Sequence, residues 1–160
     1  MSVNFAIHES ASRAERYNLL IPQVEALLDP IAGPVANMAN VSAAIHEVFG
    51  FHWVGFYLVS GNELHLGPFQ GPTACTRIAF GKGVCGEAWS RKEAVIVPDV
   101  ERFPGHIACS PHSKSEIVIP FSRNGEVIGV FDIDSDHPDD FSETDLNGLT
   151  AILSKLSHCL

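Results

Sequence analysis

A cysteine between two histidines is the feature of this sequence best suited to chemistry. Cys109 lies three residues after His106 and three residues before His112. Pro104 and Pro111 keep this segment out of regular structure. On an exposed loop near a histidine, a cysteine can lose its proton and become a nucleophile. The alternative is that Cys109 is a small buried hydrophobic residue, as many free cysteines are.

Two further cysteines are candidates for redox chemistry with Cys109. Cys75 and Cys85 both lie on segments punctuated by Gly and Pro, from which they could approach it. A sulfenic acid on Cys109 would condense with a second thiol, and an external dithiol could then reduce the disulfide. Cys159, next to the C-terminus, is assigned no role. The sequence alone does not show that these cysteines meet.

Acidic residues continue what is otherwise the apolar face of a strand. Ile128 and Val130 occupy alternate positions of the run 126–134, and Asp132 and Asp134 extend the same face as acids. Either the strand emerges into water here, or the sheet opens onto a pocket for a cationic group. The register of the neighbouring strand bears on this choice.

The hairpin around Asn124 and Gly125 allows two registers. A two-residue turn places Asp132 opposite Ile117, whereas a three-residue loop with a glycine bulge places it opposite Glu116. We expect the second register, because it gives uniform apolar layers. It also stacks two like charges, which is unfavourable unless something positive binds there. A primary ammonium is the simplest such ligand.

We expect neither a metal site nor a phosphate-binding loop. The evenly spaced histidines around Cys109 suggest zinc, but Pro111 forbids a continuous helix and a Cys-x-x-Cys half-site is absent. The acidic run from Asp132 lacks the glycine of a calcium loop. The glycine-rich segment 81–86 lacks the spacing and the terminal Lys-Ser/Thr of a P-loop.

The predicted secondary structure is an antiparallel sheet flanked by helices. Apolar spacing predicts a helical segment over 10–49, with a kink or break at Pro22, and a C-terminal helix over 142–158. Between them, 51–135 holds the sheet and the candidate loops. Strand-forming runs lie at 51–59, 63–69, 76–78, 94–97, 116–121 and 126–134. We therefore expect an α+β fold with five to six strands, as a single domain over 1–160.

The composition excludes several partners. Hydrophobic residues make up 46 % of the 160 residues, and the net charge is −9 with only 10 Lys and Arg. There is no basic stripe for nucleic acid and no apolar run of membrane-spanning length. The first residues also lack the pattern of a signal peptide. We expect a cytoplasmic protein, in which cysteines are catalytic, metal-binding or inert rather than structural disulfides.

Four segments closely resemble the free methionine-R-sulfoxide reductases, which are single GAF-fold domains. The segments are FHWVGFY, GPTACTRIAFGKGVCGEAW, FPGHIACSPHSKSEIVIP and GEVIGVFDIDSDHPDDF. The cysteines also occur at the family's intervals, ten residues from Cys75 to Cys85 and twenty-four from Cys85 to Cys109. The resemblance covers nearly the whole chain and is weakest in the N-terminal helix.

This resemblance implies a thiol enzyme that reduces the R epimer of free methionine sulfoxide without a metal or organic cofactor. Cys109 matches the nucleophile that attacks the sulfoxide sulfur and becomes a sulfenic acid. Cys75 matches the main resolving cysteine, whose disulfide with Cys109 is reduced by thioredoxin. Cys85 matches a third active-site cysteine and an alternative disulfide partner. Related proteins also suggest a homodimer.

The same resemblance assigns the substrate pocket. Glu116, Asp132 and Asp134 match the acidic residues that hold the substrate, and Trp53 and Tyr57 match its aromatic wall. Three carboxylates would bind the α-ammonium of a free amino acid, which a residue within a polypeptide lacks. We expect one of these carboxyls, with its pKa raised by its neighbours, to protonate the departing oxygen.

Two other functions remain open on the sequence. Many GAF domains are sensors that bind a small ligand without chemistry, but an acidic pocket would repel a cyclic nucleotide, and we expect no output domain beside this single domain. A thiol peroxidase or redox sensor would need Cys109 but not the carboxylates.

Overall fold

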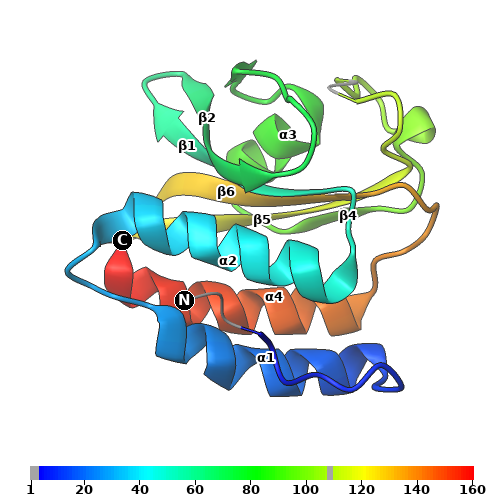
Figure 1. Cartoon of the computed structure of the whole chain (residues 1–160). Helices are drawn as coiled ribbons and strands as arrows, with labels where there is room; N and C mark the ends of the chain where they lie inside the picture. The colour runs from blue at the N-terminus through cyan, green and yellow to red at the C-terminus, as the bar shows by residue number, and fades with distance from the viewer. Residues whose placement is uncertain (1–3, 108–109) are drawn as a thin grey trace.

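The central element of the fold is an antiparallel sheet. The computed structural model describes residues 4–107 and 110–160. Within these residues, six strands are arranged in the order β3-β2-β1-β6-β5-β4 (Figure 1). The strands are β1 (Trp53–Ser60), β2 (Glu63–Gln70), β3 (Arg77–Ala79), β4 (Val95–Val97), β5 (Ser115–Arg123) and β6 (Glu126–Ser135). The expected α+β class and strand number are confirmed.

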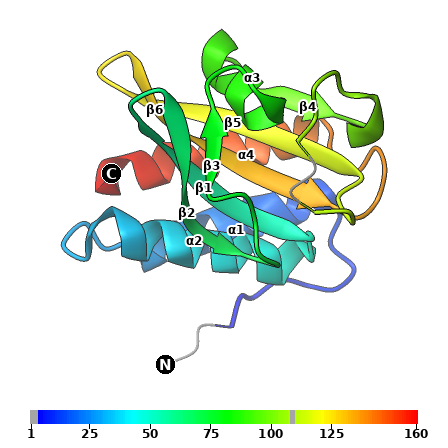
Figure 2. The same cartoon turned by 90° about the horizontal axis from the view of Figure 1, so that it is seen from above.

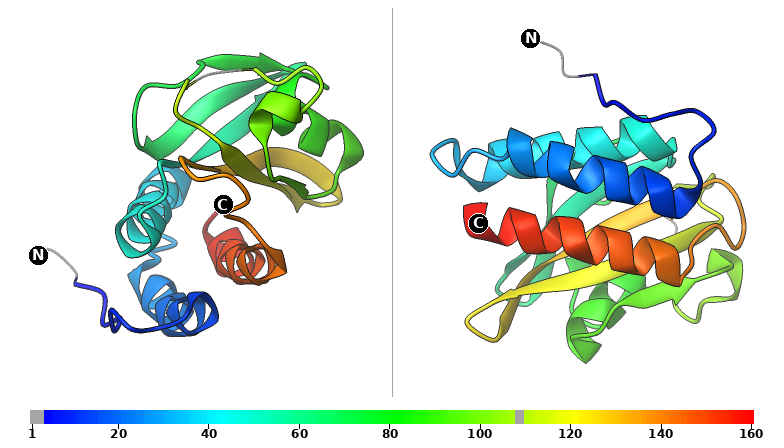
Figure 3. Two further views of the ribbon diagram at one scale, coloured as in Figure 1. Left: turned by 90° about the vertical axis from the view of Figure 1, so that its right-hand side faces the viewer. Right: turned by 90° about the horizontal axis from the view of Figure 1, so that it is seen from below.

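The two faces of the sheet are covered differently. One face carries the helices α2 (Gly33–Phe49) and α4 (Glu143–Leu156), with α1 (Arg13–Leu27) packed outside them. The other face carries the short helix α3 (Gly83–Arg91), which lies over β5 and β6 (Figure 2). Figure 3 shows the sheet separating the three long helices from α3 and the loops. The two faces therefore build separate interiors.

Strand alternation assigns side chains to these two interiors. Phe131 and Ile133 of β6 join the core beneath α2 and α4, whereas Val130 packs on the α3 side. In β1, Val54 and Phe56 are likewise on the helix side. The opposite face of the same strands is therefore available for a site.

Helix α1 runs without a break through Pro22, so of the expected kink or break the break is wrong. It begins with a capping box, in which the side chains and backbone N–H groups of Ser12 and Glu15 bond reciprocally. Pro22 removes one backbone donor from the helix. The burial of Leu20 and Val24 on either side offsets this loss, because both pack fully into the core.

The turn between β5 and β6 has two residues. Asn124 and Gly125 have φ of 53° and 82°, as a primed hairpin turn requires, and Arg123 pairs with Glu126. Further along, Phe121 pairs with Gly129, which leaves an extra residue on β6. This extra residue is a β-bulge, and it shifts the pairing of the rest of the hairpin.

Because of this bulge, neither predicted register is observed. Glu116 lies opposite Asp134, and Val118 lies opposite Asp132. The prediction that Glu116 faces Asp132 directly is wrong, since the extra residue lies on β6 rather than in the turn. The partner of Glu116 is two residues further along β6 than predicted, Asp134 in place of Asp132. Because residues two apart on a strand point to the same face, the three carboxylates still share one face.

A glycine in β1 makes room for an aromatic side chain. A Cβ added to Gly55 would lie 2.5 Å from the indole of Trp53 and 2.4 Å from Cβ of Phe69. The rings of Trp53 and Phe69 stack with their centroids 5.3 Å apart. The missing side chain of Gly55 therefore allows the indole to lie flat along the sheet.

We predict that Gly55→Ala displaces Trp53 and destabilises the fold by about 1–3 kcal/mol, because the added methyl overpacks this contact. The test is Tm and tryptophan fluorescence in a Trp89→Phe background, where Trp53 is the remaining tryptophan. Ser60→Thr, which adds a methyl at the exposed end of β1, is the control. Unchanged emission and Tm in Gly55→Ala would contradict the proposed packing.

Candidate functional site

A pocket lies on the sheet face that carries α3. Strands β1, β3, β5 and β6, helix α3 and two loops contribute to it. Its described lining residues are Trp53, Tyr57, Thr73, Ala74, Ile78, Gly83, Val84, Cys85, His106, Ile107, Ser110, Ser113, Glu116, Asp132 and Asp134. Six of the eight predicted site residues are therefore brought together in one pocket. Cys75 lies on an adjoining loop, and Cys109 lies outside the described residues.

Adjacent strands bring the three predicted carboxylates into this pocket. Glu116 of β5 pairs with Asp134 of β6, and Asp132 follows two residues away on the same face. Glu116 and Asp132 are only 5 % and 6 % exposed, and Asp134 is half-buried. Among the described lining residues there is no Lys or Arg to balance their charge.

Burial makes these carboxylates hard to ionise. It raises the pKa of Asp132 to about 6, from an ordinary value of 3.8. Burial first, and then the charge of Asp132, raises the pKa of Glu116 and Asp134 well above the usual range. Within the described residues, Oδ1 of Asp132 is buried without a hydrogen-bond partner. The cluster is therefore suited to a positively charged ligand that supplies donors.

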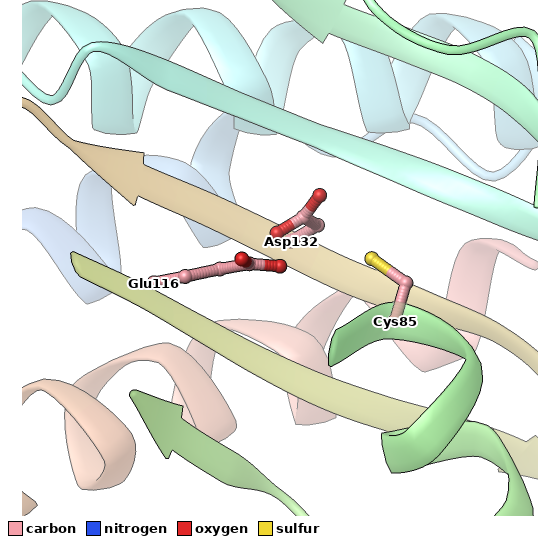
Figure 4. A group of neighbouring side chains, drawn as sticks. All are labelled: Cys85, Glu116 and Asp132. Carbon is pink, nitrogen blue, oxygen red and sulfur yellow. The ribbon is translucent and has the colours of Figure 1, made fainter. Parts of the chain in front are cut away.

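Cys85 approaches the carboxylates from α3. Its side chain is 3 % exposed and free, and Figure 4 shows it pointing toward Glu116 and Asp132. Burial, and then the charges of Asp132 and Glu116, raise the pKa of this thiol. Cys85 is therefore protonated at neutral pH and a poor nucleophile in the empty pocket.

The two predicted aromatic residues form one wall of the pocket. The rings of Trp53 and Tyr57 stack with centroids 5.9 Å apart, and both side chains are almost fully buried. Burial, and then the neighbouring carboxylates, raise the pKa of Tyr57, which keeps its hydroxyl as a donor. The wall is thus apolar toward the pocket, and each ring also carries one hydrogen-bond donor, the indole N–H of Trp53 and the hydroxyl of Tyr57.

These donors hold the loop that contains Cys75. Nε1 of Trp53 donates to the carbonyl of Pro72 at 3.1 Å, and the hydroxyl of Tyr57 donates to the carbonyl of Cys75 at 3.0 Å. Cys75 is half-buried and takes part in a disulfide bond. The sequence predicted the aromatic wall but not this second role, because strand alternation shows where a ring lies and not which backbone group it binds.

His106 is a pocket residue that the sequence did not assign. Its Nε2 lies 3.8 Å from Oε2 of Glu116, and burial lowers its pKa. It is therefore mostly neutral at neutral pH and leaves the acidic charge uncompensated. Ser113 is also buried in the lining, where its hydrogen bond lowers the pKa of Asp134. Proximity to Cys109 in the sequence was the only signal for His106.

Cys159 lies far from this pocket in the fold. It is a free, buried cysteine that packs with the core under the long helices, on the other face of the sheet. This position agrees with the absence of an assigned role. It also makes Cys159 a useful control for experiments on thiols.

We predict that Asp132→Asn stabilises the folded protein at pH 7.5 by roughly 2 kcal/mol. Because the folded pKa is raised, ionisation of Asp132 destabilises the fold above pH 6, and this cost disappears as the pH falls to about 4. Urea unfolding should therefore show a gain at pH 7.5 that vanishes near pH 4. Glu126→Gln, at an exposed position of the same strand, should show no such gain. Equal destabilisation of Asp132→Asn at both pH values would contradict the prediction.

No helix among the described residues has the length and apolar character needed to cross a membrane.

Comparison with known proteins identifies the family. A model of the GAF domain matches residues 38–160. GAF domain-containing protein A of Dictyostelium discoideum is 57 % identical over 148 residues, covering 92 % of this chain and 94 % of its own. The free methionine-R-sulfoxide reductase of Escherichia coli is 41 % identical over 150 residues, covering 93 % and 91 %. The X-ray structure of the free methionine-R-sulfoxide reductase of Neisseria meningitidis, in complex with its substrate, matches this chain with a TM-score of 0.88. The two chains are 46 % identical, and the match covers 98 % of each. This chain therefore belongs to the GAF-domain family of free methionine-R-sulfoxide reductases.

Proposed function

We propose that this protein reduces free L-methionine (R)-S-oxide to L-methionine with thiols as the source of electrons. The observation that carries the proposal is the pocket itself, in which two buried carboxylates and the half-buried Asp134 face an apolar aromatic wall. This combination suits a small molecule with an ammonium at one end and a methyl group at the other. The relatives named above support the same reaction.

Recognition of the substrate follows from charge and shape. The α-ammonium binds between Glu116, Asp132 and Asp134 and lowers their pKa, because a nearby positive charge favours the ionised carboxylates. The ammonium also supplies a donor for the unpartnered Oδ1 of Asp132. The S-methyl group packs against Trp53 and Tyr57. A methionine sulfoxide inside a polypeptide has no α-ammonium, so protein-bound substrate is rejected.

The proposed reaction proceeds through cysteine oxidation. The thiolate of Cys109 attacks the sulfoxide sulfur, and a neighbouring carboxyl protonates the oxygen. Transfer of this oxygen to Cys109 releases methionine and leaves a sulfenic acid. The Cys75 thiol then attacks the sulfenic sulfur, forming a Cys75–Cys109 disulfide and releasing water. Cys85 is the alternative thiol for this step.

An external dithiol completes the cycle. Thioredoxin reduces the disulfide and supplies the two electrons that the sulfoxide has taken up. The reaction so written needs no metal or organic cofactor, and a reducing cytoplasm is the compartment that provides it. We also propose a homodimer, formed through the N-terminal helices.

The direct test follows NADPH consumption through thioredoxin reductase and thioredoxin, with the separated R and S epimers of free methionine sulfoxide. We predict turnover of the R epimer only, its loss in Cys109→Ser, and its retention in Cys159→Ser. A pH series should show kcat/KM falling below about pH 6, as Asp132 becomes protonated. Absence of turnover with either epimer would overturn the proposal in favour of a ligand sensor.

A second test separates this activity from a general thiol peroxidase. Asp134→Ala should lower kcat/KM for methionine (R)-S-oxide by about 10- to 100-fold, because a charge-assisted contact to the ammonium is lost. The rate at which hydrogen peroxide oxidises the reduced protein should change little, since peroxide has no ammonium. An equal loss in both reactions would contradict a role of Asp134 in substrate binding.

A further inference from the structure

Three potential metal ligands converge in the pocket. The Cys85 sulfur and one carboxylate oxygen each of Glu116 and Asp132 all lie within 4.8 Å of one another. They come from α3, β5 and β6, and their side chains point toward a common centre (Figure 4). Because the three residues are far apart in the chain, no sequence spacing indicates this set.

The cluster lacks a positive partner. Oδ1 of Asp132 is buried without a hydrogen-bond partner among the described residues. No Lys or Arg belongs to the described lining, and Nε2 of His106 lies 3.8 Å from Oε2 of Glu116, beyond hydrogen-bond distance. The three residues all line the pocket, so an ion can reach them by the route that a substrate uses.

We propose that Cys85, Glu116 and Asp132 bind a zinc-class divalent cation, which inhibits the enzyme by occupying the position of the substrate ammonium. The inhibition rests on the proposed function, whereas the binding does not. Zinc suits one thiolate with two carboxylates, and magnesium and calcium avoid thiolates. The cation is an inhibitory ligand and has no part in catalysis.

The geometry requires only a modest contraction. Ligand atoms around a tetrahedral zinc ion are about 3.5 Å apart, given Zn–S and Zn–O bonds of about 2.3 and 2.0 Å. Because all three atoms already lie within 4.8 Å of one another, no pair has to approach by more than about 1 Å, which side-chain rotation can provide. A water molecule supplies the fourth ligand from the open side of the pocket.

Binding replaces protons with the metal. The Cys85 thiol, protonated in the empty pocket, must release its proton to become a ligand. Affinity for the cation should therefore increase with pH. The divalent charge also relieves the repulsion between Glu116 and Asp132, as the substrate ammonium is proposed to do. Cation and substrate consequently compete for the same carboxylate oxygens.

The binding test uses the full chain with Cys75→Ser and Cys109→Ser, in which Cys85 and Cys159 are the remaining thiols. Titration with Cd²⁺ should produce one equivalent of the ultraviolet thiolate-to-cadmium band. Adding Cys85→Ser should abolish the band, and adding Cys159→Ser should leave it unchanged. Glu116→Gln, a nearly isosteric change, should weaken binding at least tenfold. A band that survives Cys85→Ser, or none at all, would overturn the metal site.

The inhibition test is separate from the binding test. In the wild type, Zn²⁺ should raise KM for methionine (R)-S-oxide and leave kcat unchanged, and the sulfoxide should displace Cd²⁺ from the variant without Cys75 and Cys109. Cd²⁺ binding that the sulfoxide does not reverse would overturn the inhibitory role. Wild-type protein that binds metal but turns over no sulfoxide would instead overturn the proposed function and leave the metal site standing.

Discussion

The burial of negative charge beside the β5–β6 hairpin is the constraint on which the rest of the site depends. Glu116 and Asp132 are taken out of water without a compensating Lys or Arg in the described lining. Such a cluster is unfavourable until a cation enters, since both burial and like charge oppose ionisation. Binding of a positively charged ligand is therefore favourable, because it relieves the cost of burying these carboxylates. Selectivity for an ammonium follows from this shortage of positive charge.

The sheet can support this unfavourable cluster of carboxylates, because one of its faces packs the core and the other carries the site. The face under α2 and α4 packs an apolar core that includes Phe56, Phe131 and Ile133. The other face carries the carboxylates, the thiol of Cys85 and the aromatic wall. Stability comes from the first face, and a destabilised binding site is supported on the second. Successive residues of each strand alternate between these two faces, so neighbouring positions contribute either to the core or to the site.

Prediction from the sequence succeeded where the signal was local and failed where it depended on distant contacts. Helices, strands and the shared face of Asp132 and Asp134 follow from periodicity, and the place of the hairpin follows from Asn124-Gly125, although its turn has two residues and not the expected three. The strand register did not, because a bulge on β6 has no strong sequence signature. Nor did the continuity of α1 through Pro22, which tertiary packing supports. The approach of Cys85 to two carboxylates on separate strands has no local signal at all.

The hydrogen bonds from Trp53 and Tyr57 couple the shape of the pocket to the position of the loop that contains Cys75. The rings shape the pocket, while their polar atoms hold the carbonyls of Pro72 and Cys75. A redesign for a bulkier sulfoxide would have to remove one of these rings, and would thereby release the backbone next to the proposed resolving cysteine. Substrate range and recycling of the oxidised enzyme therefore cannot be engineered independently at these two positions.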